Sequence, residues 1–188
     1  SSVKADDYGF RKIGDKIVIA GHSDKTTILA CELFLKAIGS RENGEIFYES
    51  AMDTVIRGEY SLDELSLNGV AVQEFEIRYG GRDFDELAAY KLRDKIADAC
   101  GYVLDVTQEG DGEYFLYVGE EGADTSSELT LKFTETSCIL YGDDKLSAMK
   151  AVLYLEDMIL EADGASEDRS INVLLPSGES ECPEIESE

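Results

Sequence analysis

The chain has 188 residues, enough for one or two domains, and its 43% hydrophobic content is that of a globular protein. It carries 41 Asp and Glu against 17 Lys and Arg, a net charge of −24, which opposes binding to nucleic acid and to anionic membranes. The sequence holds no apolar run as long as the roughly 18 residues that a membrane span needs, so we expect no membrane insertion.

The first forty residues predict a β-hairpin followed by a helix. Tyr8 to Ile13 and Lys16 to Ala20 are two short strands, and Gly14-Asp15 suits a type II′ turn, in which Gly takes a positive φ. In the polar loop that follows, Ser23 is placed to cap the helix and the helix dipole favours Asp24. Apolar residues then recur at helical spacing and predict one buried stripe of Ala30, Leu33, Phe34, Ala37 and Ile38.

The middle of the chain predicts a strand and a second helix. The segment 40–69 reads as a connector with some strand character, and the alternation of Phe75, Ile77 and Tyr79 predicts a half-buried strand. After Gly80-Gly81 a helix is expected from about Phe84 to Cys100, closed by Gly101. Its inward face is predicted to be Ala88, Ala89, Leu92, Ile96 and Ala99, and its first-turn acids, Asp83, Asp85 and Glu86, to have a capping role.

The second half predicts two more strands, a hairpin and a third helix. Tyr102 to Thr107 is a strand, and the unbroken apolar strand Tyr114 to Val118 is expected to be central. The hairpin pairs Leu129 to Phe133 with Thr136 to Tyr141, and the helix has the inward stripe Ala148, Val152, Leu155 and Ile159. Beyond Ser177 the Glu- and Ser-rich sequence predicts a linker or frayed end.

The chain contains an internal repeat. At an offset of 120 residues (144 − 24), Ile19 aligns with Ile139, Asp24 with Asp144, and Lys25 with Lys145. The repeat predicts an α+β fold, a mixed β-sheet with helices packed on it, as a duplicated module with the first copy incomplete. The predicted parts are 1–39, the C-terminal half of a first module; 40–69, a connector; 70–164, a complete second module; and 165–188, an acidic linker. An incomplete module leaves its helix partly uncovered, so we expect it to pack on the complete module or to self-associate.

The sequence contains partial matches to a phosphate-binding loop and to an active site, but neither motif is complete. Gly21 to Thr27 resembles a phosphate-binding loop, but it is one residue short and has Asp24 where the second glycine belongs. His22 with Asp24 remains a minor alternative as a self-contained active site. The four cysteines have no framework spacing and there is one histidine, so neither a zinc site nor a disulfide framework is predicted.

Two groups of residues are candidates for binding a ligand, and neither matches a complete binding motif. Glu109, Asp111 and Glu113 gather oxygen ligands around glycines and are candidates for calcium, although the spacing is not that of a calcium loop. Tyr114 and Tyr117 are candidates for binding sugar, since sugar-binding surfaces present aromatic rings, but strand tyrosines are often core residues. We assign no catalytic residue, no cofactor and no metal.

Three segments resemble a known family. Ala88 to Tyr102 matches the pattern A-A-x-x-L-x-x-x-I-x-x-A-x-G-Y, Tyr114 to Gly119 is similar to a following "ILVG" strand, and Tyr8 to Asp24 is similar to a "GY-hairpin-K-I-x-I-x-G-G-x-D" segment, with His22 at the second glycine. The family is the non-catalytic N-terminal α/β domain of glycoside hydrolase family 20 β-N-acetylhexosaminidases and of α-glucuronidases. The resemblance implies an extracellular or cell-surface bacterial protein in a carbohydrate context, and it transfers no catalytic residue.

From the resemblance we predict an accessory or scaffold domain of a larger secreted bacterial hydrolase, and not an enzyme in itself. Its partners would be neighbouring domains of the same polypeptide and possibly a glycan. The alternative is a stand-alone module that binds glycan or calcium.

Overall fold

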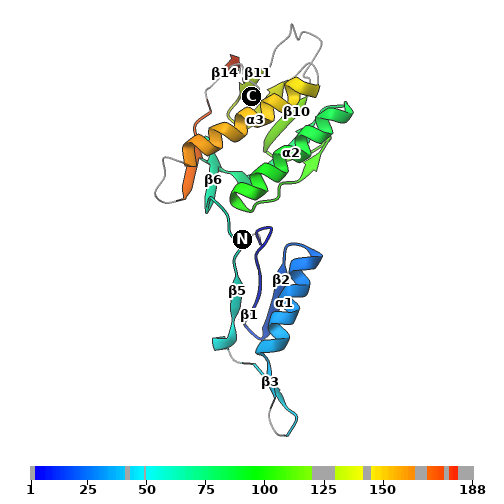
Figure 1. Ribbon diagram of the computed structural model, residues 1–188, viewed down its shortest axis with the longest axis vertical. Helices are drawn as coiled ribbons and strands as arrows, with labels where there is room; N and C mark the ends of the chain where they lie inside the picture. The colour runs from blue at the N-terminus through cyan, green and yellow to red at the C-terminus, as the bar shows by residue number, and fades with distance from the viewer. Residues whose placement is uncertain are drawn as a thin grey trace. The chain divides into compact units, whose positions relative to one another are not determined.

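The computed structural model describes residues 3–40, 43–48, 50–119, 130–141, 145–163, 169–175 and 178–181. The chain forms two compact units, Ser1–Glu59 (unit 1) and Tyr60–Glu188 (unit 2), which are drawn in Figure 1. Both combine β-sheet with helix, so the predicted α+β class is confirmed. The boundary between the units falls inside the segment 40–69 that we expected to be a connector.

Unit 1 is a three-stranded sheet with one helix. The sheet has the order β2-β1-β5, and β1 is antiparallel to both neighbours. The helix α1 packs against β1 and β2, beside which it lies in Figure 1. The elements are β1 (Tyr8–Ile13), β2 (Lys16–Gly21), α1 (Asp24–Ala37), β3 (Gly39–Ser40), β4 (Ile46–Phe47), the 3-10 turn η1 (Ser50–Met52) and β5 (Thr54–Ile56).

The hairpin and the helix cap of unit 1 form as the local sequence predicts. Gly14 has φ of 59°, which the first position of the predicted turn requires. Ser23 caps α1: its Oγ accepts the backbone N–H of Thr26 at 3.3 Å, and the Thr26 Oγ1 accepts the backbone N–H of Ser23 at 2.8 Å. The reciprocal pair satisfies two N–H groups that a helix start otherwise leaves without partners.

Aromatic rings form the centre of unit 1. Phe10, on the α1 face of β1, is 1% exposed. Its ring centroid lies 5.3 Å from that of Phe34 on α1 and 6.1 Å from that of Tyr48, with the rings edge to face. Such pairs add about 0.5–1.5 kcal/mol beyond the area they bury. Along the predicted stripe, Ala30 is buried and Leu33, Phe34, Ala37 and Ile38 are half-buried.

Unit 2 is built on a six-stranded mixed sheet of order β14-β11-β12-β10-β8-β9. β10 is central and runs parallel to β12 and β8, while β11 is antiparallel to β12. A smaller sheet has the order β13-β6-β7. The elements are β6 (Glu64–Leu67), β7 (Val70–Ala71), η2 (Val72–Glu74), β8 (Phe75–Tyr79), α2 (Asp83–Cys100), β9 (Val106–Thr107), β10 (Tyr114–Gly119), β11 (Thr130–Phe133), β12 (Ser137–Tyr141), α3 (Lys145–Asp163), β13 (Ser170–Val173) and β14 (Gly178–Glu181).

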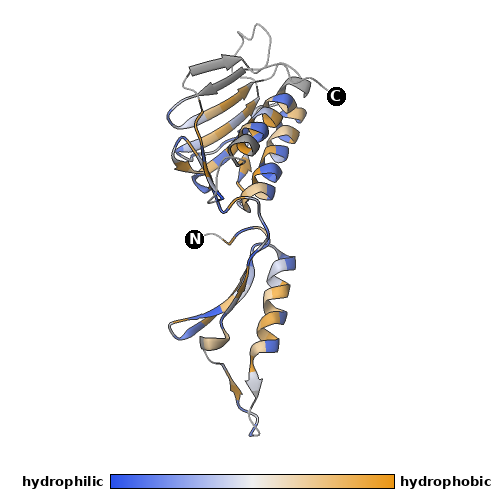
Figure 2. Cartoon of the chain, turned by 60° about the vertical axis from the view of Figure 1, so that its left-hand side comes forward, coloured by the Kyte–Doolittle hydropathy of each residue, from blue (hydrophilic) through white to orange (hydrophobic). Residues whose placement is uncertain are grey.

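Helices α2 and α3 lie side by side on one face of this sheet (Figure 1, Figure 2). The main core of unit 2 lies between them and the strands. Leu116 of β10 stands beside Ile77 of β8 and Cys138 of β12, and all three are buried. The helices contribute the inward residues that the 3.6-residue spacing predicts: Ala88, Ala89, Leu92 and Ile96 from α2, and Ala148, Val152, Leu155 and Ile159 from α3.

Unit 2 also uses segments expected to lie outside the modules. β6 comes from 40–69 and pairs in parallel with β13, while both β13 and β14 come from 165–188. The sequence explains why β13 forms: Ile171, Val173 and Leu175 alternate with exposed residues and pack into the core. The expected strand 102–107 is shorter, since only Val106–Thr107 pairs with β8.

The hairpin and helix of unit 1 recur in unit 2 as β11, β12 and α3. β2 and β12 begin 121 residues apart (137 − 16), and so do α1 and α3 (145 − 24), one more than in the sequence alignment. The strand faces agree with this spacing. Ile19 lies opposite Phe10 on the face that α1 covers, and the matching core residue of β12 is Leu140 rather than Ile139.

Candidate functional site

The two predicted sugar-binding tyrosines lie on opposite faces of β10. Tyr114 points to the helix side, where it is packed against the core and its ring lies 5.5 Å from that of Phe75. Tyr117, three positions later, is on the other face, in register with Arg78 and Ile139. Both are half-buried. The structure therefore does not bring them together into one aromatic surface.

The acidic turn 108–113 is held to the sheet through its backbone, by Arg78 of β8. Glu109, Asp111 and Glu113 are all exposed. Arg78, which forms an ion pair with Glu76, donates from Nη2 to the carbonyl of Gly112 at 2.8 Å, and its guanidinium lies 4.1 Å from the Phe115 ring centroid. Within the described part of the chain no three His, Cys, Asp or Glu residues form a metal-binding group, so these three carboxylates do not converge.

At the carboxyl ends of β8 and β10 an ion pair between a buried carboxylate and a half-buried arginine holds the start of α2. The Asp85 carboxylate, fully buried, accepts from Arg82 through the backbone N–H at 3.3 Å, Nε at 2.9 Å and Nη2 at 2.8 Å. Gly80 makes room for it, because a Cβ there would lie 2.5 Å from Asp85 Oδ2. This arrangement is the capping role predicted for Asp85, with Arg82 neutralising the charge.

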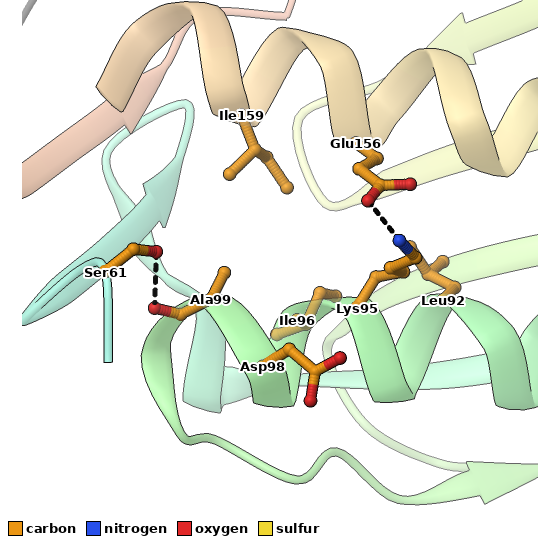
Figure 3. Close-up of a pocket in the computed structure, with 8 residues that line it drawn as sticks. All are labelled: Ser61, Leu92, Lys95, Ile96, Asp98, Ala99, Glu156 and Ile159. Atoms are coloured by element: carbon orange, nitrogen blue, oxygen red, sulfur yellow. Dashed lines mark hydrogen bonds and ion pairs between the residues drawn. The ribbon is translucent and has the colours of Figure 1, made fainter. Parts of the chain in front are cut away.

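A small cavity lies between α2 and α3 (Figure 3). Its volume is about 180 Å³, and it is lined by Ser61, Leu92, Lys95, Ile96, Asp98, Ala99, Glu156 and Ile159. Figure 3 shows Ile159 and Glu156 projecting from α3 toward α2. At one end Lys95 forms an ion pair with Glu156, and at the other the Ser61 hydroxyl donates to the carbonyl of Ala99 at 3.1 Å.

The size and lining of this cavity decide what it can hold. Sites for small-molecule ligands usually measure about 300–1,000 Å³, and a cavity of about 150 Å³ holds a benzene-sized group. Lys95 and Glu156 at the rim are paired with each other, and Asp98 adds an exposed carboxylate. The wall is formed largely by Leu92, Ile96 and Ile159. The cavity thus fits one apolar side chain better than it fits a sugar ring with its many hydroxyl groups.

The sequence analysis did not predict a role for Arg82 or the presence of the cavity. A role for Arg82 could have been inferred, because three acidic residues follow it in the first turn of the helix. The cavity had none, since Lys95 and Glu156 are 61 residues apart in the chain and meet only when α2 packs on α3. His22 and Asp24, the minor alternative, are both exposed at the start of α1.

No protein-family model and no curated protein sequence matches the chain. Among solved structures, the family 20 β-N-acetylhexosaminidase from Streptomyces coelicolor A3(2) has 19% identity and a TM-score of 0.42, over 58% of this chain and 22% of the enzyme. A Streptomyces plicatus N-acetyl-β-hexosaminidase in complex with Thio-NAglucal has 20% identity and a TM-score of 0.39, over 56% and 21%. A GH138 enzyme targeting pectin rhamnogalacturonan II has 12% identity and a TM-score of 0.38, over 46% and 10%.

These matches correct one prediction. We expected that the chain is not an enzyme, but the solved structures named above are glycoside hydrolases, which contradicts that expectation. The chain spans less than a quarter of the length of each of them. No helix among the described residues is long and apolar enough to cross a membrane.

Proposed function

We propose that the chain is an accessory module of a carbohydrate-active protein, and that it holds a neighbouring domain in place through the α2–α3 face of unit 2. The observation that carries the proposal is the cavity between these helices. It is too small for an oligosaccharide, the larger part of its wall is apolar, and Lys95 and Glu156 at its rim are paired with each other. A single apolar side chain from an adjoining domain satisfies all three conditions.

The motif resemblance supplies the carbohydrate context. Its helix pattern includes Ala88, Ala89, Leu92 and Ile96, the buried face of α2, and its strand pattern is the central strand β10. Two of the three resembling segments therefore contribute to the core of unit 2. On this proposal the module belongs to a secreted bacterial hydrolase, whose other domains are its partners.

The first experiment is a thermal-shift screen of the purified chain with Ca²⁺ and with soluble N-acetylglucosamine oligosaccharides, combined with hydrolysis of an aryl N-acetylglucosaminide. A ligand that binds the native state raises the melting temperature. We expect no saturable shift with either kind of ligand, and the hydrolysis assay decides whether the chain is itself an enzyme. A saturable shift with sugar or Ca²⁺ would instead make the chain a binding module, and hydrolysis that tracks the purified chain would make it an enzyme.

A second experiment addresses the cavity in the complete protein encoded by the gene. Ala99→Lys fills the cavity with a charged side chain, whereas Ala97→Lys places the same side chain on the same helix outside the cavity. We expect Ala99→Lys to increase proteolytic cleavage between this module and its neighbour, and Ala97→Lys to leave it unchanged. Equal cleavage in the two variants would remove the cavity from the proposed interface.

A further inference from the structure

The helix of unit 1 presents an apolar stripe to solvent. Ile28 and Leu35 are 59% and 65% exposed, and Cys31, between them, is also exposed. At positions i, i+3 and i+7 the three side chains share one side of α1, next to the buried face that contains Ala30 and Phe34. Figure 2 shows hydrophobic residues along the length of this helix. We call Ile28, Cys31 and Leu35 the α1 stripe.

The strand beside the α1 stripe is an edge of its sheet. β2 pairs with β1, and in the described residues the sheet ends there. Ile17 and Val18 of β2 are each 40% exposed, and the strand carries one charge, Lys16, and no proline. Soluble proteins commonly protect an edge strand with charges, prolines or bulges, because a free edge is a template for another strand.

Unit 2 shows how the same surfaces are covered when the structure around them is complete. There β10 occupies the corresponding edge of β12, and α2 packs along the corresponding side of α3. At the 121-residue spacing Cys31 corresponds to Val152, which is buried, and Leu35 corresponds to Glu156, which pairs with Lys95 of α2. The α1 stripe therefore lies where a second helix belongs, and the edge of β2 where a further strand belongs.

We infer that a second copy of this chain fills both places. A two-fold axis perpendicular to the sheet joins two β2 strands antiparallel and sets two α1 helices antiparallel on the same face. The product is a six-stranded sheet with two helices on one side, as in unit 2, except that the two strands at the junction are antiparallel whereas β12 and β10 are parallel. Because Cys31 lies near the middle of the α1 stripe, the antiparallel helices bring Ile28 toward Leu35 of the second copy and Cys31 toward its own counterpart.

The charge distribution favours this occupant. Unit 1 contains 8 Lys and Arg and 10 Asp and Glu, a net charge of −2, so the remaining −22 of the chain's −24 belongs to unit 2. Two copies of unit 1 therefore meet with little repulsion, whereas a contact between two copies of unit 2 brings strongly charged surfaces together. Self-association through unit 1 is therefore opposed by less electrostatic repulsion than self-association through unit 2.

The first test is the mass of the chain in solution, measured by light scattering coupled to gel filtration. We expect a dimer, twice the 20.7 kDa of the chain. Leu35→Glu and Ile28→Glu, each at an exposed position, are expected to give the monomer mass with an unchanged circular dichroism spectrum. Leu174→Glu, at a residue of unit 2 that is 74% exposed, is the matched control and is expected to leave the dimer intact.

The second test uses Cys31 as a reporter. In a Cys182→Ser variant Cys31 is the one exposed thiol of the sequence, since Cys100 and Cys138 are buried. A short bismaleimide is expected to produce a cross-linked dimer that Cys31→Ser and Leu35→Glu both abolish. A monomer at the highest soluble concentration would overturn the inference. So would a dimer that survives Leu35→Glu, or one whose Cys31 residues do not cross-link.

Discussion

In unit 2 the hairpin β11–β12 and helix α3 lie within a larger structure, with β10 at one side of the hairpin and α2 beside the helix. In unit 1 the hairpin β1–β2 and helix α1 are most of the structure, and β5 is the one strand added to the hairpin in the described residues. The consequence is visible in burial. Val152 of α3 is fully buried, whereas Cys31, its counterpart in α1 at the 121-residue spacing, is exposed.

The comparison shows that a hairpin and a helix bury only one side of the helix. In unit 1 that side is filled by Phe10, Phe34 and Tyr48, three rings that contact each other. In unit 2 smaller side chains such as Ala148 and Ala151 let α3 approach both the strands and α2. The core of unit 1 therefore depends on three rings, whereas that of unit 2 is shared among two helices and the strands against which they pack.

The largest effect is expected from Phe10→Ala. Removing a buried Phe costs about 3–5 kcal/mol, and a unit of this size has little stability in reserve. We expect unit 1 to unfold while unit 2 keeps its transition, as measured by hydrogen exchange followed by mass spectrometry. Leu116→Ala in β10 is the reciprocal variant, with a cost of about 2–5 kcal/mol confined to unit 2. If either substitution destabilised both units equally, the two-unit division would be wrong.

A smaller effect is expected from Asp85→Ala in unit 2. The substitution removes the partner of Arg82 and the cap of α2, and because Arg82 stays partly accessible to water we expect a loss of about 2–3 kcal/mol. Urea denaturation gives the free energy of unfolding. Asp83→Ala is the matched control, since Asp83 is exposed in the same turn and contributes less than about 1 kcal/mol. Equal losses would mean that the Arg82–Asp85 pair adds nothing beyond the helix dipole.

The alkaline pH dependence is expected to distinguish unit 1. Burial, followed by the hydrogen bond to Asp53 and its charge, raises the pKa of Tyr48 to about 12, against a small opposite effect of the backbone at Lys12. Because the pKa is raised on folding, the stabilisation is complete below pH 10 and is lost as the pH rises from 10 to about 12. The melting temperature of unit 1 should fall over that range, and less so in Tyr48→Phe. Parallel curves for the two proteins would contradict this assignment.

The smallest effect is expected from salt. Unit 2 carries −22 of the net charge, and salt screens the mutual repulsion of surface carboxylates. We expect added sodium chloride to stabilise unit 2 by about 0.5–1 kcal/mol, or a few degrees in melting temperature, with almost no effect on unit 1. Calorimetry that resolves the two transitions measures both. An equal rise in both would show that the charge asymmetry has no energetic consequence.

Local signals in the sequence were sufficient for most of the elements. The cap at Ser23, the positive φ of Gly14 and the end of α2 before Gly101 each depend on residues within a few positions. The central position of β10 followed from its unbroken apolar run. The pairing of β6 with β13 was not predicted. Tertiary packing brings Leu65 and Ile171 together, and no local sequence pattern identifies either residue as the partner of the other.

The candidate site was less predictable than the fold. Tyr114 and Tyr117 could be placed on one strand, and a separation of three residues already puts them on opposite faces of it. The capping role of Asp85 was predictable from its place in the first turn of α2. The cavity beside Ile159 depends on the distance between α2 and α3, which the sequence pattern of neither helix predicts.

The pairing of β6 with β13 also sets an order of events during synthesis. β6 must wait for β13, whose first paired residue, Ser170, follows Glu64 by 106 positions (170 − 64). At about 5–20 residues per second the ribosome needs about 5–20 s to supply it. The last strand of the unit 1 sheet ends at Ile56, so unit 1 can close while β6 is still without its partner. A nascent chain stalled before Ser170 should therefore expose Leu65 and Leu67 to chaperones, although its first sheet is already complete.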